Sequence, residues 1–245
     1  HLIAFVEAGG TLVDTAAAYA EGRSEELLGS LLGDVAHRDE LVVATKAAIS
    51  ARDGRTHVDA SRGALLSTLD ASLRRLGVDH VDLWQHHRPD PTVPYEEVVE
   101  TLKRVHDAGK VRMVGLSNAN PEQIRLARSV LGDALVSVQN QFSPAFRSSA
   151  PEIEVCAELG LAFLPWSPLG GLNSAKGLGD EHPAFAEIAS ERGVSPQQVA
   201  LAWELAQDRC VIPIPGAKRP SSITDSAAAA DLELSAEELA RLDAS

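Results

Sequence analysis

Short apolar runs alternate with longer segments of helical period along the whole chain. The short runs are rich in β-branched residues and predict strands. They cover Thr11–Thr15, Leu41–Lys46, His80–His87, Val111–Asn118, Ala134–Asn140, Leu161–Trp166 and Cys210–Ile214. Between them, apolar residues recur three and four positions apart, the spacing that buries one face of a helix against a sheet. Two such stripes are Leu65, Leu69, Leu73 and Leu76, and Val98, Leu102 and Val105. The chain therefore consists of repeated βα units.

Caps and breakers mark the helix boundaries. Asn120 before Pro121 and Ser195 before Pro196 predict helix starts, because a side-chain oxygen caps free N–H groups and proline fits the first turn. Gly160 predicts a helix end, since glycine closes a helix in the left-handed conformation at no steric cost. No linker rich in Pro, Gly or Ser interrupts the βα units. We therefore expect residues 1–245 to form a single parallel α/β domain.

Two architectures fit repeated βα units: a closed barrel and a doubly wound open sheet. The open sheet of dinucleotide-binding proteins carries a Gly-x-Gly-x-x-Gly turn after its first strand, and no such turn follows Thr11–Thr15. The nearest match has Gly177 and Gly179 at the first spacing but His182 at the position of the third glycine. The sequence therefore favours an α/β fold of the (β/α)8 TIM barrel class.

Polar residues end six successive predicted strands. They are Asp14, Lys46, His87, Ser117 with Asn118, Gln139 with Asn140, and Trp166 with Ser167. Strand ends that only packed against helices would not need a lysine, a histidine or amides. Because the carboxyl ends of barrel strands converge on one mouth, where active sites are built, these positions predict a catalytic site.

Charge narrows the range of partners. The chain has 35 acidic and 22 basic residues and a formal net charge of -13, which repels nucleic acids and anionic lipid surfaces. With 44% hydrophobic and 23% charged residues, it is a folding chain rather than a disordered one. No run approaches the length of a membrane-spanning helix, and the first ten residues lack the order of a signal peptide.

The two cysteines, Cys156 and Cys210, lie far apart in apolar segments. This arrangement predicts buried reduced thiols rather than a disulfide framework or a metal site. We therefore expect a cytoplasmic location and no metal. No feature of the sequence sets the oligomeric state, and a monomer is the simplest expectation.

A series of motifs then follows in a fixed order. They are Val13-Asp14-Thr15-Ala16 with Tyr19, then Gly22, Ser24, Glu25, Leu28 and Gly29; Val42 to Lys46; Val81 to Asp90; Gly109 to Arg112 leading into Val114 to Asn118; Val138-Gln139-Asn140; Trp166 to Gly170; and Ile212 to Gly216. Together they resemble the aldo-keto reductases, which are (β/α)8 barrel enzymes that reduce carbonyls with a nicotinamide cofactor. The resemblance covers essentially the whole chain.

The resemblance implies a catalytic tetrad of Asp14, Tyr19, Lys46 and His87. When hydride reaches a carbonyl carbon, the oxygen becomes negative and needs a proton donor, and Tyr19 is the expected donor. An ordinary tyrosine has a pKa of about 10, and an adjacent ammonium such as Lys46 favours the phenolate. Asp14 is expected to pair with Lys46, and His87 to orient the substrate oxygen. His86 is expected on the opposite face of its strand.

The resemblance also implies a cofactor site for NADP, with NAD as a possible alternative. Ser117, Asn118 and Gln139 match positions that hold the nicotinamide carboxamide, and Trp166 matches the aromatic residue that stacks on the ring. The pyrophosphate and ribose loop corresponds to Ser167, Pro168, Leu169 and Gly170, with Ile214 and Gly216 following the last strand. Lys218 and Arg219 are expected to hold a 2'-phosphate. Each position also has a plainer interpretation, as a strand-end cap, a core aromatic or a solvated loop.

The sequence departs from the family in several places. Ser222 and Ser226 stand where many members have an arginine and an asparagine that contact the adenosine end, so we expect only a modest preference for NADP. Trp84 stands where tyrosine is usual, and Ala119 where an aromatic residue often follows. The segment His1 to Gly9 resembles the end of the first barrel helix, so the first strand is missing from the chain. We expect an N-terminally incomplete barrel, with further residues in the natural protein.

The implied function is NADPH-dependent reduction of a small aldehyde or ketone to the alcohol by direct hydride transfer. The alternative is a cofactor-binding regulatory subunit resembling the potassium-channel β-subunits of the same family. A third interpretation is an unrelated barrel such as a lyase or isomerase. Substrate contacts in such barrels come from variable loops, so the motifs leave the identity of the carbonyl substrate open.

Overall fold

The computed structural model describes residues 2–32, 41–52, 55–171 and 175–245. The chain divides into two compact units. The first, here called the sheet unit, is Thr11–Gln139. The second, the C-terminal unit, combines His1–Gly10 with Asn140–Ser245.

Five parallel strands form the centre of the sheet unit. They are β1 (Leu12–Asp14), β2 (Val42–Ala47), β5 (Val81–His86), β6 (Val111–Ser117) and β7 (Leu135–Gln139), hydrogen-bonded in this order. The register places Asp14 opposite Ala44, Lys46 opposite Gln85, and Ser117 opposite Gln139. The strands predicted here are confirmed to within one or two residues. Their polar ends come together because all five strands run in the same direction.

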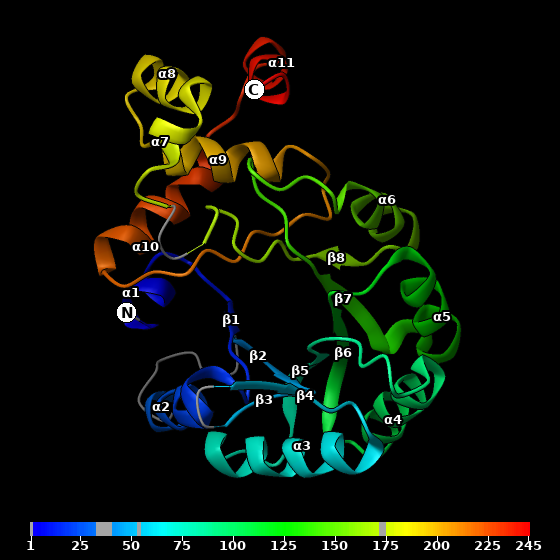
Figure 1. The fold of residues 1–245 in the computed structure, drawn as a ribbon. Helices are drawn as coiled ribbons and strands as arrows, with labels where there is room; N and C mark the ends of the chain where they lie inside the picture. Colours follow the sequence, from blue (N-terminus) through cyan, green and yellow to red (C-terminus); the bar gives the residue numbers. More distant parts are fainter. Residues whose placement is uncertain (1, 33–40, 53–54, 172–174) are drawn as a thin grey trace. The chain divides into compact units, whose positions relative to one another are not determined.

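Helices cover one face of this sheet (Figure 1). They are α2 (Arg23–Leu32), α3 (Arg62–Leu76), α4 (Tyr95–Asp107) and α5 (Pro121–Leu131), with the short 3-10 helices η1 (Tyr19–Gly22) and η3 (Gly132–Ala134). The predicted stripes are buried, except that Leu73 is only partly covered. Asn120 caps α5 as predicted. Its side chain accepts from the Gln123 backbone N–H, and the Gln123 side chain accepts from the Asn120 backbone N–H.

A β-hairpin follows β2 that the alternation of apolar runs did not predict. It consists of β3 (Ile49–Arg52) and β4 (Arg55–Val58), paired antiparallel. Its arms are short and mixed in polarity, so they carry little hydrophobic signal. The sequence does contain a signal for it, because Asp53 and Gly54 form an Asp-Gly pair between two short arms, a strong hairpin indicator.

The C-terminal unit is mainly helical. It contains α1 (Leu2–Glu7), α6 (Ala150–Leu159), β8 (Ala162–Phe163), α7 (Leu178–Glu181), α8 (Pro183–Arg192), α9 (Pro196–Leu205), α10 (Pro220–Ala227), η4 (Ala228–Asp231) and α11 (Ala236–Asp243). The helix expected near the N-terminus is α1, and residue 1 of that prediction lies outside the described residues. In the described ranges, no helix has both the length and the apolar character to cross a membrane.

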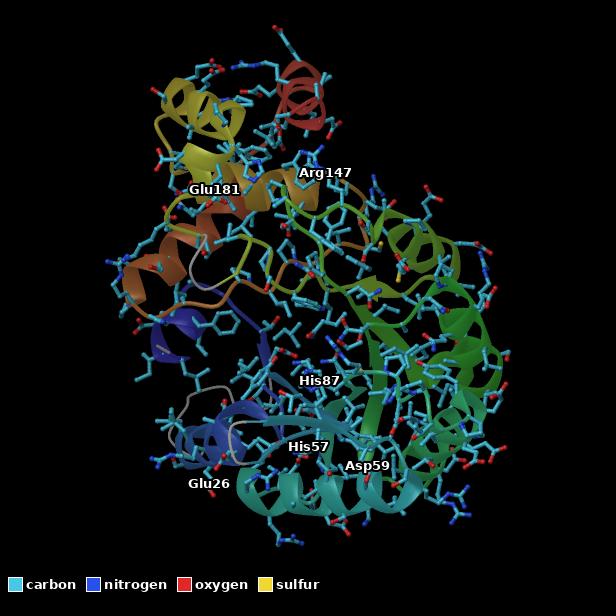
Figure 2. All side chains as sticks on the ribbon, viewed as in Figure 1. Glu26, His57, Asp59, His87, Arg147 and Glu181 are labelled. Atoms are coloured by element: carbon cyan, nitrogen blue, oxygen red, sulfur yellow. The ribbon has the colours of Figure 1, made fainter. Side chains whose placement is uncertain are left out.

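Aromatic side chains form the core of the C-terminal unit. Trp203 stacks on Phe142 at a centroid distance of 5.5 Å, and Phe163 and Phe185 meet these rings edge-on. The guanidinium of Arg147 lies 4.8 Å from the centroid of the Trp203 ring, and Figure 2 shows Arg147 beside α9. The Trp203 indole N–H donates to Asp243, which fastens α11 to this core.

Two strand predictions in the C-terminal unit were wrong in extent. The strand over Leu161–Trp166 is reduced to β8, and Cys210–Ile214 is not a strand but a single bridge between Val211 and Phe163. The segment still runs beside β8, since Ile212 N–H donates to Phe163 O. Pro165 has no N–H to donate to this segment, and the next bond, from Ile214 N–H to Pro165 O, is long at 3.4 Å, so the pairing is too weak here to form a strand.

Both cysteines are free thiols, as predicted. Cys156 is buried, whereas Cys210 is partly exposed, so the expectation of two buried thiols was half right. Burial raises the pKa of Cys210 to about 11, which keeps it a thiol near neutral pH.

The packing of α2 on α3 depends on one glycine. A Cβ at Gly29 would lie 2.5 Å from the carbonyl oxygen of Arg75 and 2.8 Å from that of Leu76. These atoms belong to backbone and cannot move aside independently. We expect Gly29→Ala to lower the free energy of unfolding by about 1–3 kcal/mol, measured by chemical denaturation.

The matched control for this substitution is Gly63→Ala. Gly63 lies in α3, and a Cβ there would meet no atom within 4 Å. Because alanine is the better helix former, this variant should be neutral or more stable by up to about 1 kcal/mol. Equal losses from both variants would show that close helix contact at Gly29 is not the cause.

Candidate active site

A buried ion pair joins the ends of β1 and β2. The Lys46 side chain is 0% exposed, and its Nζ donates to Asp14 Oδ2 at 2.5 Å and to the Thr15 carbonyl at 2.9 Å. Lysine is almost never fully buried without such partners. This is the pair expected from the sequence.

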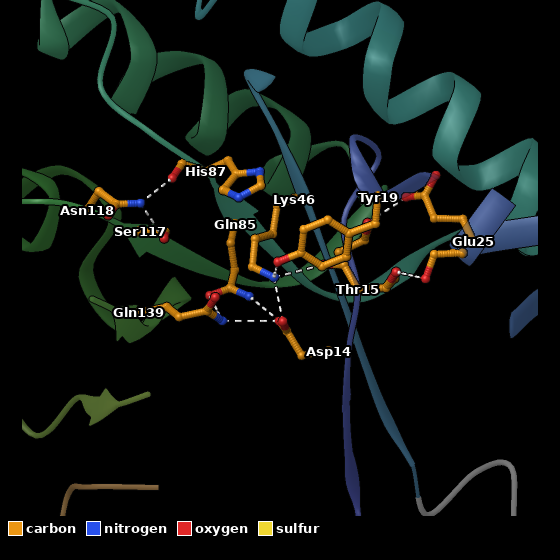
Figure 3. Close-up of polar contacts among 12 residues, drawn as sticks. Asp14, Thr15, Tyr19, Glu25, Lys46, Gln85, His87, Ser117, Asn118 and Gln139 are labelled. Carbon is orange, nitrogen blue, oxygen red and sulfur yellow. Dashed lines mark hydrogen bonds and ion pairs between the residues drawn. The ribbon is translucent and has the colours of Figure 1, made fainter. Parts of the chain in front are cut away.

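Tyr19 lies against this ion pair. Lys46 Nζ donates to Tyr19 Oη at 3.5 Å and lies 5.1 Å from the centroid of its ring (Figure 3). The tyrosine side chain is 43% exposed, so a small molecule can reach it. The backbone after it takes three positive φ angles, 49° at Ala20, 56° at Glu21 and 92° at Gly22. Such conformations are costly for residues other than glycine and need support from their surroundings.

That support comes from Glu25, the buried carboxylate at the start of α2. Thr45 Oγ1 donates to Glu25 Oε1 at 2.5 Å, and Arg75 Nε donates to Oε2 at 2.7 Å. The same guanidinium packs against Gly22, where a Cβ would lie 2.8 Å from Arg75 Nε. Glu25 thus fastens the turn that carries Tyr19 to β2 and to α3.

His87 completes the group. Its ring meets that of Tyr19 edge-on at a centroid distance of 6.0 Å, and its backbone N–H donates to Ala47 O. Burial and, next, the positive charge of Lys46 lower the pKa of His87 to about 3. The imidazole is therefore neutral near pH 7, and it can donate a hydrogen bond without supplying a net proton.

His86 points to the other face of β5, as expected from strand alternation. Its ring lies 5.7 Å from that of Tyr95 of α4, and no side chain in the described part of the protein bonds either ring nitrogen. Burial lowers the pKa of His86 to about 4 and raises the pKa of Tyr95 well above its usual value.

Two amides contact the second oxygen of Asp14. Gln85 Nε2 donates to Asp14 Oδ1 at 3.0 Å, and Gln139 Nε2 donates to the same oxygen at 3.1 Å. Gln139 was expected to contact the cofactor, and Gln85 was not singled out. Period-two alternation was the signal that could have found it, since Gln85 stands two residues before His87 in the same strand segment.

Asn118 and Ser117 lie beside these groups. Asn118 Nδ2 donates to the His87 carbonyl at 3.0 Å and to Ser117 Oγ at 3.1 Å, while its backbone N–H donates to Gln139 O. Asn118 has a φ of 57°, a conformation that asparagine tolerates better than most residues. The sheet unit thus gathers seven predicted site residues: Asp14, Tyr19, Lys46, His87, Ser117, Asn118 and Gln139.

The other predicted positions belong to the C-terminal unit. The backbone N–H of Trp166 donates to Asn140 O, and the backbone turns sharply after it, with φ of 54° at Ser167 and 78° at Gly170. Lys218 and Arg219 are exposed at the start of α10. The remaining positions are Pro168 and Leu169 in the turn, Ile214 and Gly216 before α10, and Ser222 and Ser226 within it.

Known proteins share this sequence and fold. A model of the Aldo/keto reductase family matches residues 2–245. The probable aldo-keto reductase 1 of Glycine max is 33% identical over 258 aligned residues, which cover 94% of this chain and 74% of that protein.

Solved structures match nearly the whole chain. An aldo/keto reductase from Klebsiella pneumoniae, in complex with NADP and acetate, matches with a TM-score of 0.84 and 29% identity, over 99% of this chain and 82% of that one. The glycerol dehydrogenase of Gluconobacter oxydans matches with a TM-score of 0.86 and 25% identity, over 99% and 83%. These matches confirm the predicted fold class, the (β/α)8 barrel.

The buried His86 predicts how stability depends on pH. Its pKa is about 4 in the folded state and about 6.5 when unfolded, so the unfolded chain binds more protons between these values. Stability from this group is therefore complete above about pH 6.5 and is lost as the pH falls toward 4, by about 3 kcal/mol in all. We expect His86→Gln to make the dependence of unfolding free energy on pH less steep across this window, with the part due to His87 remaining.

The control is His57→Gln, because His57 is exposed (Figure 2). This variant should keep the slope of the parent protein. A slope that is the same in all three proteins would exclude His86 as the source of acid sensitivity.

Proposed function

Because the chain belongs to the aldo-keto reductase family of carbonyl-reducing oxidoreductases, we propose that it reduces a small aldehyde or ketone to the alcohol with NADPH and that Tyr19 donates the proton. The observation that carries this proposal is the contact of the buried Lys46 ammonium with both Asp14 and Tyr19. A fully buried lysine that reaches an exposed phenol suits proton transfer better than packing.

The proton path follows from these contacts. A carbonyl oxygen bound near Tyr19 gains negative charge during reduction, and the phenol proton moves to that oxygen. The resulting phenolate is stabilised by the Lys46 ammonium, whose position is fixed by Asp14. Solvent then returns the proton to the phenol, since Tyr19 is partly exposed.

His87 is better suited to orient the substrate than to protonate it. With a pKa of about 3, its imidazolium form is scarce near neutral pH. A neutral imidazole can still donate one hydrogen bond to the carbonyl oxygen. This leaves Tyr19 as the proton source.

The residues present fit a nicotinamide cofactor. When bound, NADPH supplies the hydride that the carbonyl carbon accepts. In the sheet unit, Ser117, Asn118 and Gln139 would hold its carboxamide. The stacking role of Trp166 stays a prediction from the resemblance. Both Nε2 hydrogens of Gln139 have acceptors, Asp14 Oδ1 and Gln85 Oε1, so its carbonyl oxygen is the atom that would accept from the carboxamide.

The C-terminal unit, taken by itself, holds groups whose chemistry suits a dinucleotide. The turn Ser167–Gly170, with its positive φ angles, exposes backbone where a pyrophosphate needs donors. Lys218 and Arg219 stand before α10, and neither has an ion-pair partner within the described ranges. A helix start and two free cations suit a 2'-phosphate, with Ile214, Gly216, Ser222 and Ser226 nearby in the chain.

The runner-up is a cofactor-binding regulatory subunit that resembles the potassium-channel β-subunits. It would bind NADPH without sustained turnover. The complete set of Asp14, Tyr19, Lys46 and His87 favours the enzyme.

A single domain over residues 1–245, a monomeric state and a cytoplasmic location stay predictions.

The test measures NADPH oxidation with a panel of small aldehydes and ketones in the parent protein and in Tyr19→Phe. We expect sustained turnover in the parent. Removing the phenol hydroxyl should lower turnover by about two to four orders of magnitude while NADPH still binds. Binding is followed separately by tryptophan fluorescence.

The matched control is Tyr95→Phe, which changes the other of the two tyrosines in the chain. The Tyr95 hydroxyl is buried and its ring packs against His86, so its substitution should leave turnover nearly unchanged. Near-normal turnover in Tyr19→Phe would remove Tyr19 from the mechanism. Tight NADPH binding by a parent protein that reduces no member of the panel would favour the regulatory subunit.

The preference for NADPH over NADH tests whether Lys218 and Arg219, before α10, hold the 2'-phosphate. Charge-assisted hydrogen bonds contribute roughly 1.5–3 kcal/mol each, so the double variant Lys218→Ala, Arg219→Ala should lose its preference for NADPH over NADH. Binding of NADH should change little. The measurement is the dissociation constant of each cofactor by fluorescence titration.

Arg209→Ala serves as the control for lost positive charge. Arg209 is exposed before the segment 210–214, at the end away from α10, and its removal should leave the preference unchanged. If the double variant prefers NADPH as strongly as the parent, the 2'-phosphate is held by other residues.

A further inference from the structure

The two oxygens of Asp14 are held in different ways. Oδ2 accepts from the Lys46 ammonium, whereas Oδ1 accepts from two uncharged amides, those of Gln85 and Gln139. The amides also bond each other, since Gln139 Nε2 donates to Gln85 Oε1 at 3.4 Å. Asp14 is therefore fixed at both ends, by a charge on one side and by a pair of amides on the other.

Gln85 has no surface role. It is 0% exposed and faces Lys46 in the register of β2 and β5. A buried amide carries a large desolvation cost unless its donors and acceptor are used. Gln85 meets that need inside the site, with one bond given to Asp14 and one accepted from Gln139.

The neighbouring strand leaves room for this side chain. On β6, a Cβ at Gly115 would lie 2.8 Å from Gln85 Cγ and 2.6 Å from Ser137 Oγ. Gly115 pairs with Gln85 in the register of β5 and β6. Any larger residue at position 115 would push Gln85 away from Asp14.

We propose that Gln85 is a positioning residue for the reduction, which holds the Asp14 carboxylate in the orientation that keeps Lys46 against Tyr19. The inference rests on the proposed function. Gln85 itself touches neither substrate nor cofactor in this role, because it acts through Asp14. Among the described residues of the sheet unit, Lys46 contacts Asp14 directly, and Tyr19 and His87 lie next to Lys46 (Figure 3).

The test replaces Gln85 by Met, which has a similar shape and no N–H donor. A donated hydrogen bond favours the ionised carboxylate, so its loss favours the protonated form. Carboxyl carbon NMR of the chain without cofactor, with Asp14 assigned from Asp14→Asn, should show Asp14 titrating at a higher pH in the variant than in the parent. The acid limb of the pH–turnover profile should move in the same direction, and turnover should fall about tenfold or more.

A second variant, Gln85→Glu, allows the shifts of the Asp14 titration to be ranked, and a change in packing alone would not produce the expected ranking. In Gln85→Glu, two carboxyl groups share one site and hold a proton between them. The Asp14 titration should then rise further than in Gln85→Met. The control is Leu83→Met, which alters packing two residues earlier on β5, where Leu83 pairs with Ala44 and not with Lys46. Leu83→Met should leave the Asp14 titration at the same pH as in the parent protein.

The outcomes separate the two proposals. An unchanged Asp14 titration in both Gln85 variants, or an equal shift in Leu83→Met, would overturn the positioning role. A shifted titration in a protein whose parent reduces no carbonyl would leave Asp14 held by Gln85 and would overturn the proposed function instead.

Discussion

The buried ammonium of Lys46 is the constraint on which the site depends. Taking a charge out of water costs several kcal/mol, and this cost is offset only by close partners of the right chemistry. Those partners are the carboxylate of Asp14, the Thr15 carbonyl and the phenol of Tyr19. They come from the end of β1 and from the turn that follows it, so Lys46 holds that strand end and its turn against β2.

Asp14 links the Lys46 ammonium to two further strands of the sheet. Its second oxygen is held by Gln85 of β5 and Gln139 of β7, so four strand ends must share one edge of the sheet. Parallel register makes this possible, because every carboxyl end points the same way. Glycine at position 115 then leaves the space that Gln85 occupies.

Burial acts in two ways on the residues around this ion pair. It lowers the pKa values of His86 and His87, which keeps both imidazoles neutral near pH 7. For His87 this also permits a donor to the substrate oxygen, and for both residues it makes the folded state sensitive to acid. Burial also makes the Glu25–Arg75 pair a firm support for the turn of Tyr19, since a partner removed from a buried pair leaves an uncompensated charge.

The sequence by itself determined the strands of the sheet unit, the apolar faces of its helices and the residue types at its strand ends. Period two and period 3.6 are local properties that need no tertiary structure. Local patterns failed where pairing between distant segments decided, as in the segment 210–214, which faces Pro165, a residue with no N–H to donate. Only the tertiary structure decided which groups meet, because Asp14 and Gln139 are 125 residues apart in the chain. The sequence placed Asp14 and Gln139 at strand ends. The bonds that Gln85 and Gln139 donate to Asp14 depend on the register of the strands and on the space left at Gly115. Neither can be read from the spacing of residues along the chain.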